Sequence, residues 1–178
     1  MRDTAGVNTQ EPPVTTPLRM TIATVADTDT LFRLLQLYYF EASAWSGEEI
    51  QPDGLYDCAR SDVEATLNAQ PAWAQLLWRD DTLCGFVLVD DVAFQGQPIR
   101  ELADLFVSPA HRGNGIAAAV VAALVTPQSG PWLLATWRKD LQAKAFWQRN
   151  LPKMGVEVEI PSDDNASDFD MCLIRRMH

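Results

Sequence analysis

The sequence predicts an α/β protein in which helices cover both faces of a mixed β-sheet. Three observations lead to this fold class. Residues 99–126 contain an apolar run, a glycine-rich turn and a second apolar run that is half alanine. Short segments with alternating apolar residues lie on both sides of this stretch. Other segments between them repeat their apolar residues at helical spacing, as expected when strands and helices interleave.

The composition fits one domain and limits its function. The chain has 178 residues, of which 47% are hydrophobic, enough for a real core. The net charge of −10 argues against nucleic-acid binding and permits attraction of a cationic substrate. We expect no membrane helix and no secretory signal, because no apolar run is long enough. The three widely spaced cysteines predict free thiols in the cytoplasm and no metal site.

The N-terminal third predicts a tail, a strand and a helix. Residues 1–18 are polar and contain prolines, which predicts a disordered tail. Residues 20–25 alternate and predict a short strand. The apolar residues among 31–38 fall on one helical face, so we expect a helix there. Residues 41–56 mix acidic residues with glycine and predict a loop or a broken helix.

The middle of the chain predicts a second helix followed by a hairpin. Residues 61–70 begin with a capping-box pattern, which favours a helix start at that point. Residues 73–79 and 83–89 predict two strands, joined across the polar turn 80–82. Residues 90–98 predict a loop that leads into the central strand.

The central strand, turn and helix follow directly. Residues 100–107 end in Leu-Phe-Val and predict a mostly buried strand. Residues 108–115 are rich in residues that break regular structure. Residues 116–125 contain no polar residue and end before Pro127, which predicts a buried helix.

The C-terminal part predicts one more strand–helix pair and a closing hairpin. Residues 132–137 predict a strand and residues 140–150 a helix. Residues 156–160 and 169–175 alternate and predict an antiparallel pair, joined by the acidic, turn-rich segment 161–168. The complete expected order is β-α-α-β-β-β-α-β-α-β-β.

The glycine turn has the features of an anion site. The first N–H groups of a helix lack partners and carry partial positive charge. Gly113 and Gly115 remove side chains that would keep a ligand away, and Arg112 adds a guanidinium suited to phosphate. A pyrophosphate would then lie on the N–H groups from Arg112 to Ala117. The same residues also suit an ordinary tight turn before a core helix.

Two common nucleotide-binding loops do not account for this turn. Residues 113–118 formally fit the dinucleotide fingerprint G-x-G-x-x-G/A. That fingerprint opens a βαβ unit with several strand–helix units after it, and the rest of this chain does not contain them. A Walker A loop fails because no Gly-Lys-Ser/Thr follows.

The segment Arg112–Ala117 resembles the R/Q-x-x-G-x-G/A signature of the GNAT superfamily of N-acetyltransferases. Val107–Pro109 is similar to the strand exit that precedes this signature. The resemblance implies a GNAT acyl-CoA N-acyltransferase fold over residues 19–178. It also implies a splay between strands 100–107 and 132–137, which admits the pantetheine arm of acetyl-CoA.

The resemblance further implies that acetyl-CoA binds at the glycine turn and its flanking residues. A second motif supports this, since residues 140–147 resemble the family's N-x-x-A-x-x-F-Y segment. Trp147 replaces the usual tyrosine, which often reprotonates the CoA thiolate, so that role is vacant or filled by another group. Phe146 also suits a core aromatic position. The cofactor-binding residues implied in this way are Phe106, Val107, Arg112, Gly113, Asn114, Gly115, Ile116, Ala117, Asp140 and Phe146.

Two acidic residues of the central strand are candidate proton acceptors. Attack of an amine on a thioester needs such a group. Glu101 lies at a spacing before Arg112 where several GNAT enzymes keep a general-base glutamate, and Asp104 follows. A regular strand puts the two on opposite faces unless a bulge intervenes. The resemblance also implies that the N–H of Val107 polarises the thioester carbonyl. Both acids equally suit solvated strand ends.

The N-terminal helix and the following loop are the expected acceptor side. Tyr39, Glu41 and Trp45 combine acidic and aromatic groups, which suits an ammonium ion. The run Tyr38–Glu41 is similar to a bacterial GNAT subgroup of predicted acetyltransferases. The same region also suits a solvated acidic loop.

The sequence therefore predicts an N-acetyltransferase that moves an acetyl group from acetyl-CoA to a primary amine. The acceptor would be a cationic small molecule or peptide, and a homodimer is left open. Direct attack is expected because no Cys or Ser lies in a recognisable activated setting. The alternative is a non-catalytic acyl-CoA-binding or sensor module, which the missing tyrosine favours.

Overall fold

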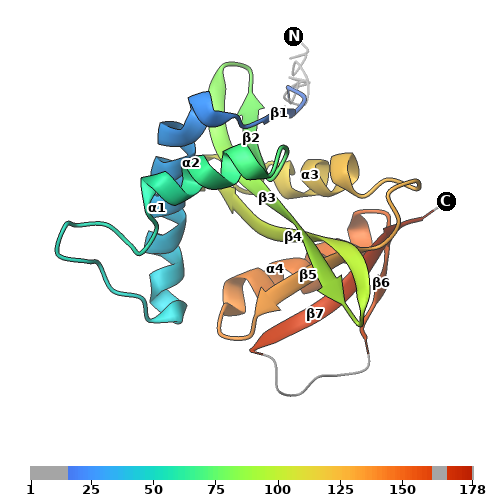
Figure 1. Cartoon of the computed structure of the whole chain (residues 1–178). Coiled ribbons are helices and arrows are strands. Elements are labelled where there is room, and N and C mark those ends of the chain that lie inside the picture. Colours follow the sequence, from blue (N-terminus) through green and yellow to red (C-terminus); the bar gives the residue numbers. More distant parts are fainter. Residues whose placement is uncertain (1–15, 162–167, 178) are drawn as a thin grey trace, which may run out of the picture.

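The computed structural model describes residues 16–161 and 168–177 (Figure 1). Residues 1–15 of the predicted tail and residues 162–167 of the predicted acidic turn lie outside this part. Within it, no helix is long and apolar enough to cross a membrane.

The described elements confirm the predicted order, with three short 3-10 helices added between them. The strands are β1 (Arg19–Ile22), β2 (Ala74–Arg79), β3 (Thr82–Phe94), β4 (Gln97–Val107), β5 (Trp132–Trp137), β6 (Val156–Glu159) and β7 (Phe169–Arg176). The helices are α1 (Thr28–Ser46), α2 (Arg60–Ala69), α3 (Ile116–Leu124) and α4 (Leu141–Asn150). The 3-10 helices are η1 (Val25–Asp27), η2 (Pro109–His111) and η3 (Leu151–Lys153).

The strands form one mixed sheet in the order β1-β2-β3-β4-β5-β7-β6. All neighbours are antiparallel except β4 and β5. The register of this parallel pair contains only Arg100 opposite Trp132 and Glu101 opposite Leu133. Beyond these positions β4 and β5 separate, as the family resemblance implied. Backbone groups of both strands therefore lack a strand partner on the sides that face this gap.

Two hydrophobic cores cover the two faces of the sheet. One core joins α1 and α2 to the sheet and includes Leu31, Leu67 and Phe86. The other joins α3 and η3 to the opposite face and includes Val120 and Trp132. Figure 1 shows α1 and α2 together across one side of the long strands, with α3 beyond them. The predicted two-sided α/β layering is confirmed.

The loop predicted at residues 90–98 is wrong, because β3 and β4 form a longer hairpin. Asp90 pairs with Glu101, and the register continues to Phe94 opposite Gln97. Gln95 and Gly96 make the turn, with φ values of 49° and 75°. The polar residues at the start of this segment favoured a loop in the sequence, although exposed strand positions also accept polar side chains.

The predicted boundaries of α1 also need correction. The sequence predicts a loop or a broken helix at residues 41–56, and the first of these residues, through Ser46, continue α1. The loop begins at Gly47, which has φ of 80°. Trp45 gives this last turn a packing partner outside the helix, since its ring lies 5.8 Å from that of Trp137. β1 ends at Ile22 rather than at residue 25.

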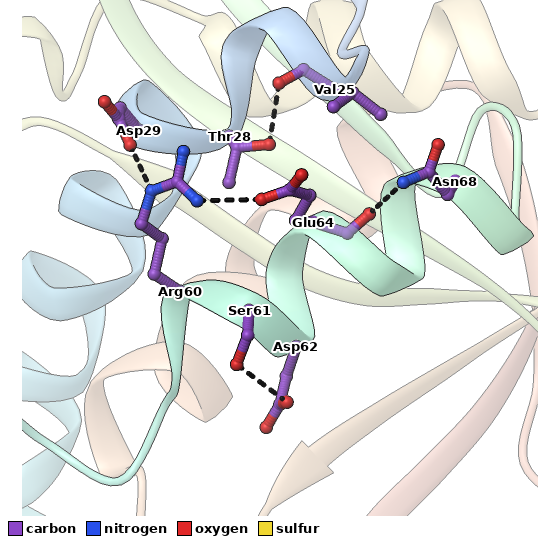
Figure 2. A network of polar contacts seen from close by, with 8 residues as sticks. All are labelled: Val25, Thr28, Asp29, Arg60, Ser61, Asp62, Glu64 and Asn68. Carbon is purple, nitrogen blue, oxygen red and sulfur yellow. Dashed lines mark hydrogen bonds and ion pairs between the residues drawn. The ribbon is translucent and has the colours of Figure 1, made fainter.

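The capping box expected at Ser61 does not form. The carboxylate of Glu64 accepts a hydrogen bond from Arg60 Nη1 at 2.8 Å, and the Ser61 hydroxyl contacts Asp62 at 3.4 Å. Arg60 Nε also donates to Asp29 Oδ1 of α1 at 2.5 Å, and this bridge joins the two helices (Figure 2). All of these groups are at least partly exposed, so they contribute little to stability and mainly orient α2.

Candidate active site

An open loop leads from β4 into α3. Gly113 and Gly115 both have φ of 76°, a conformation that glycine adopts without strain. A Cβ atom at either position would meet nothing within 4 Å. Residues 112–115 are exposed, and Gly115 is the residue before the first turn of α3. The backbone N–H of Arg112 donates to the carbonyl oxygen of Pro109 at 3.3 Å, so it is not free for a ligand. The exposed residues 113–115 and the first turn of α3 have the features of an anion site. We call residues 112–117 the cradle.

Two arginines hold the cradle in place. Arg112 Nε donates to the carbonyl oxygen of Val107 at 2.7 Å, and its Nη2 lies 2.5 Å from Glu41 Oε2. The guanidinium of Arg79, at the end of β2, donates to the carbonyl oxygen of Asn114. No pattern in the sequence pointed to Arg79, which lies 35 positions before its partner. It adds a second cation beside the cradle.

Some predicted cofactor residues face the cores instead of the loop surface. Phe106 and Ile116 are each 3% exposed, on opposite faces of the sheet. The Phe106 ring stacks on Phe86 at 5.8 Å. These two residues can offer only backbone groups to a ligand. Ala117 and Val107 are half-buried.

A cavity of about 450 Å³ lies at the gap between β4 and β5. Its walls come from α1, β4, β5 and the start of α4. A second cavity of about 910 Å³ extends among β5, α4, β6 and β7. The two share Leu134, Thr136, Trp147 and Phe169 in their walls, so they adjoin beside β5. The separation of β4 from β5 thus leaves open space beside β5.

A β-bulge brings both candidate acids into the smaller cavity. Leu88 pairs with Asp104, and Val89 pairs with Leu102, so Ala103 is an extra residue in β4. Such an insertion offsets the alternation of side chains. Glu101 and Asp104 therefore both line the cavity. The sequence did not determine whether the two acids lie on the same face of the strand, and the bulge puts them on the same face.

Asp104 has a specific partner that the sequence did not indicate. The phenol of Tyr38, on α1, donates a hydrogen bond to Asp104 Oδ1. Burial raises the pKa of Asp104, the Tyr38 hydrogen bond lowers it, and the charge of Asp90 raises it again. The net effect is a pKa above the ordinary value. Burial, followed by the charges of Asp90 and Asp104, also raises the pKa of Glu101.

The predicted acceptor-side residues separate into two places. Tyr39 and Trp45 line the cavity, whereas Glu41 lies at the cradle with Arg112. The ring of Trp137 lies between Trp45 and Phe169, with centroid distances of 5.8 and 5.0 Å. Among the residues that the structure describes, no lysine, arginine or histidine lines this cavity. Its walls combine carboxylates and aromatic rings with aliphatic side chains.

The second predicted motif forms the start of α4. Asp140 Oδ1 accepts a hydrogen bond from the backbone N–H of Ala143 at 2.8 Å, which caps the helix. Asp140 also lines the cavity, as does Trp147. Phe146 is 36% exposed and packs against Trp147 with ring centroids 4.9 Å apart. It is not part of the cavity wall.

Comparison with known proteins shows the family of this chain. Residues 29–151 match the sequence model of the acetyltransferase (GNAT) family, which covers more than half of the chain. The chain belongs to the GNAT family. Among curated protein sequences, none matches. GNAT proteins use acetyl-CoA, and the open cradle of this member fits the diphosphate of that molecule.

Solved structures of low sequence identity share the GNAT fold. An acetyltransferase from Thermus thermophilus is 18% identical with a TM-score of 0.63, and the match covers 92% of this chain and 99% of that one. A GNAT acetyltransferase from Streptococcus agalactiae is 14% identical with a TM-score of 0.60, covering 90% and 96%. A diaminobutyrate acetyltransferase from Paenibacillus lautus, in complex with L-2,4-diaminobutyric acid and coenzyme A, is 12% identical with a TM-score of 0.56, covering 90% and 95%.

Within the part of the chain that the structure describes, no group of three or more potential metal ligands occurs. The residues beside the cradle and in the wall of the smaller cavity include two arginines, several carboxylates and several aromatic rings.

Proposed function

We propose that this GNAT protein transfers an acetyl group from acetyl-CoA to a primary amine of a cationic acceptor. The observation that carries the proposal is a pair of features along β4. The strand separates from β5 after two registered pairs, and it then leads into an exposed cradle with room above both glycines. Together they suit a long thioester with a phosphate-bearing end.

The donor would bind with its diphosphate at the cradle and its pantetheine arm in the gap beside β4. Acetyl-CoA supplies a thioester, whose carbonyl carbon accepts a nucleophile. Arg112 and Arg79 place positive charge beside the cradle. Unpaired backbone groups of β4 and β5 face the gap and can bond to the amides of the arm.

The acceptor would bind in the acidic, aromatic cavity. Carboxylates of Glu101 and Asp104 and the rings of Tyr39 and Trp45 line it. Such walls attract an ammonium group and stack on its alkyl chain. The same carboxylates can take the proton that the amine must lose before it attacks.

Direct attack suits this site better than an acyl-enzyme on cysteine. The nucleophilic form of cysteine is the thiolate. Burial raises the pKa of Cys172 to about 11, and burial also raises the pKa of Cys58. Cys84 is buried in the core and donates to the carbonyl oxygen of Thr82 at 3.3 Å. The thiolates of Cys58 and Cys172 are therefore scarce at neutral pH.

Two measurements test the proposal. Calorimetry should show CoA binding, and thiol release from acetyl-CoA should rise with at least one probe among 1,4-diaminobutane, L-2,4-diaminobutyric acid and a lysine-containing peptide.

Gly115→Asp should weaken CoA binding by at least about tenfold, since it adds bulk and negative charge to an anion site. Gly115→Asn separates charge from bulk, and Gly130→Asp is the matched control at another glycine with positive φ (71°) and open space. Unchanged CoA affinity in Gly115→Asp would refute the cradle.

One observation favours a second function, a non-catalytic acyl-CoA-binding module. Trp147 lies in the cavity wall where a tyrosine is usual in the family, and an indole gives up no proton near neutral pH. Tight CoA binding without thiol release for any amine would support the module and reject the transferase.

A further inference from the structure

Tyr38 occupies a central and well-supported place on α1. Its ring packs edge-on against Phe86 at 6.0 Å and Phe106 at 6.4 Å, and it touches Tyr39 at 5.5 Å. These contacts fix the direction of the phenol, which reaches Asp104 Oδ1 across the cavity wall. The contact therefore joins α1 to the bulge of β4.

Asp104 has a rigid hydrogen-bond partner in the cavity wall. Its carboxylate has a half-buried aromatic donor on one oxygen, and the residue itself lies in the cavity wall. The extra residue Ala103 puts it on the same face as Glu101, next to Tyr38. A carboxylate that is oriented by a rigid partner is suited to accept a proton in one direction.

We propose that Tyr38 is a positioning residue that holds the carboxylate of Asp104 as the proton acceptor of the acyl transfer. This inference rests on the proposed function. As the amine nitrogen bonds to the thioester carbon, the C–S bond breaks and its electron pair leaves with the sulfur. The proton shed by the nitrogen goes to Asp104, and the thiolate takes a proton from water. Tyr38 keeps its own proton throughout.

The charges around Asp104 make the role of Tyr38 measurable. The other acidic groups around it are Glu101 on β4, Asp90 on β3, Glu48 after α1 and Asp140 before α4. Strand β5 adds no titratable group to the wall. Tyr38 is thus the group that favours the ionised form, while burial and Asp90 oppose it. Burial and the charge of Asp104 in turn keep the phenol of Tyr38 protonated, because they raise its pKa.

The test compares Tyr38→Phe with a matched loss of a phenol elsewhere. Tyr56→Phe removes a hydroxyl that donates to Ser43 Oγ at 3.2 Å and does not line the cavity. NMR with ¹³C-labelled aspartate follows the carboxyl of Asp104 through a pH titration. We expect its midpoint to rise in Tyr38→Phe and to stay at the wild-type value in Tyr56→Phe. An unmoved midpoint in folded Tyr38→Phe would overturn the inference.

A measurement on the wild-type chain covers the case in which Tyr38→Phe does not fold. The ¹³Cζ signal of Tyr38 reports its hydrogen bond, so it should titrate with the same midpoint as the Asp104 carboxyl. Independent midpoints would also reject the pairing. Neither NMR result depends on an acceptor being known.

The kinetic consequence is a displaced pH profile. With any amine that the wild type acetylates, the acidic limb of kcat/KM should move to higher pH in Tyr38→Phe, with a loss of about tenfold on that limb and recovery at higher pH. A uniform loss at all pH values would indicate a merely structural role. If the wild type acetylates no amine, the proposed function fails, whereas an unmoved profile beside an active wild type rejects only the role of Tyr38.

Discussion

Glu41 on α1 and Arg112 at the start of the cradle form an ion pair, with 2.5 Å between Glu41 Oε2 and Arg112 Nη2. The two residues lie 71 positions apart in the chain. A carboxylate therefore occupies one side of the guanidinium that the sequence predicts to bind phosphate. The pair also connects the helix that lines the acceptor cavity to the loop that would hold the donor.

Removing this carboxylate should strengthen CoA binding. In Glu41→Gln the guanidinium loses its anionic neighbour, so we expect CoA affinity to rise by up to about fivefold at low ionic strength, within the range of an exposed ion pair. Calorimetry at low and high salt measures this, and the gain should shrink as salt is added. Glu64→Gln, which breaks the exposed pair with Arg60, is the control. A weaker affinity in Glu41→Gln would show that the pair supports the cradle instead.

Gly85 is required by the close approach of β3 to β4. A Cβ atom at position 85 would lie 2.0 Å from the carbonyl oxygen of Phe106. Gly85→Ala should lower the free energy of unfolding by about 3 kcal/mol or more, because the backbone of β4 must move. Gly47→Ala, where φ is 80° and the space is open, should cost only about 1 kcal/mol. Urea denaturation compares the two, and equal losses would contradict the steric explanation.

Asp140 should stabilise α4 as its N-terminal cap. Asp140→Ala leaves the N–H of Ala143 without its acceptor at 2.8 Å, and we expect a loss of about 1 kcal/mol in the free energy of unfolding. Asp140→Ser keeps a side-chain acceptor and should recover most of it. Thermal and urea unfolding of the three proteins provide the measurement. If Asp140→Ala matches the wild type in stability, the cap has no energetic role.

Asp104 should make stability depend on pH. Burial raises the pKa of its carboxyl above 3.8, so the folded chain holds this proton more tightly than the unfolded chain does. The contribution of Asp104 to the free energy of unfolding therefore falls as pH rises from 3.8 through the folded pKa. Above that value the cost of the desolvated charge is fully present.

Asp104→Asn removes this dependence, because an amide resembles the protonated acid. The stability of Asp104→Asn relative to the wild type should thus increase from pH 4 to pH 8, as followed by urea denaturation across that range. Asp81→Asn, in the exposed turn between β2 and β3, serves as the control. A difference that shrinks with rising pH would contradict the assigned direction.

Several parts of the fold were predictable from local pattern. The alanine-rich run after Gly115 and the alternation in 132–137 predict α3 and β5 because each pattern matches one period over a whole element. The open glycine turn was predictable because Gly113 and Gly115 directly precede an apolar helix, whereas its use as a phosphate site stays a prediction. The strand pairing of segment 90–98 was not predictable, because two adjacent acids, the half-buried Asp90 and the exposed Asp91, resemble a loop in sequence.

The site was only partly predictable. Glu101 and Asp104 could be named as candidate acids, but their common face depends on the bulge at Ala103. Tyr38 occupies a core-facing helical position in the sequence, and its hydrogen bond spans 66 positions. Glu41 was assigned to the acceptor side and lies instead beside the cradle.

The sequence by itself determined the order of the elements, the family resemblance and the cradle, because periodicity and glycine spacing act between near neighbours in the chain. Only the tertiary structure decided which side chains meet in the cavity and where β4 leaves β5. Those features depend on strand register and on contacts between distant segments, and packing selects them only after the elements have formed.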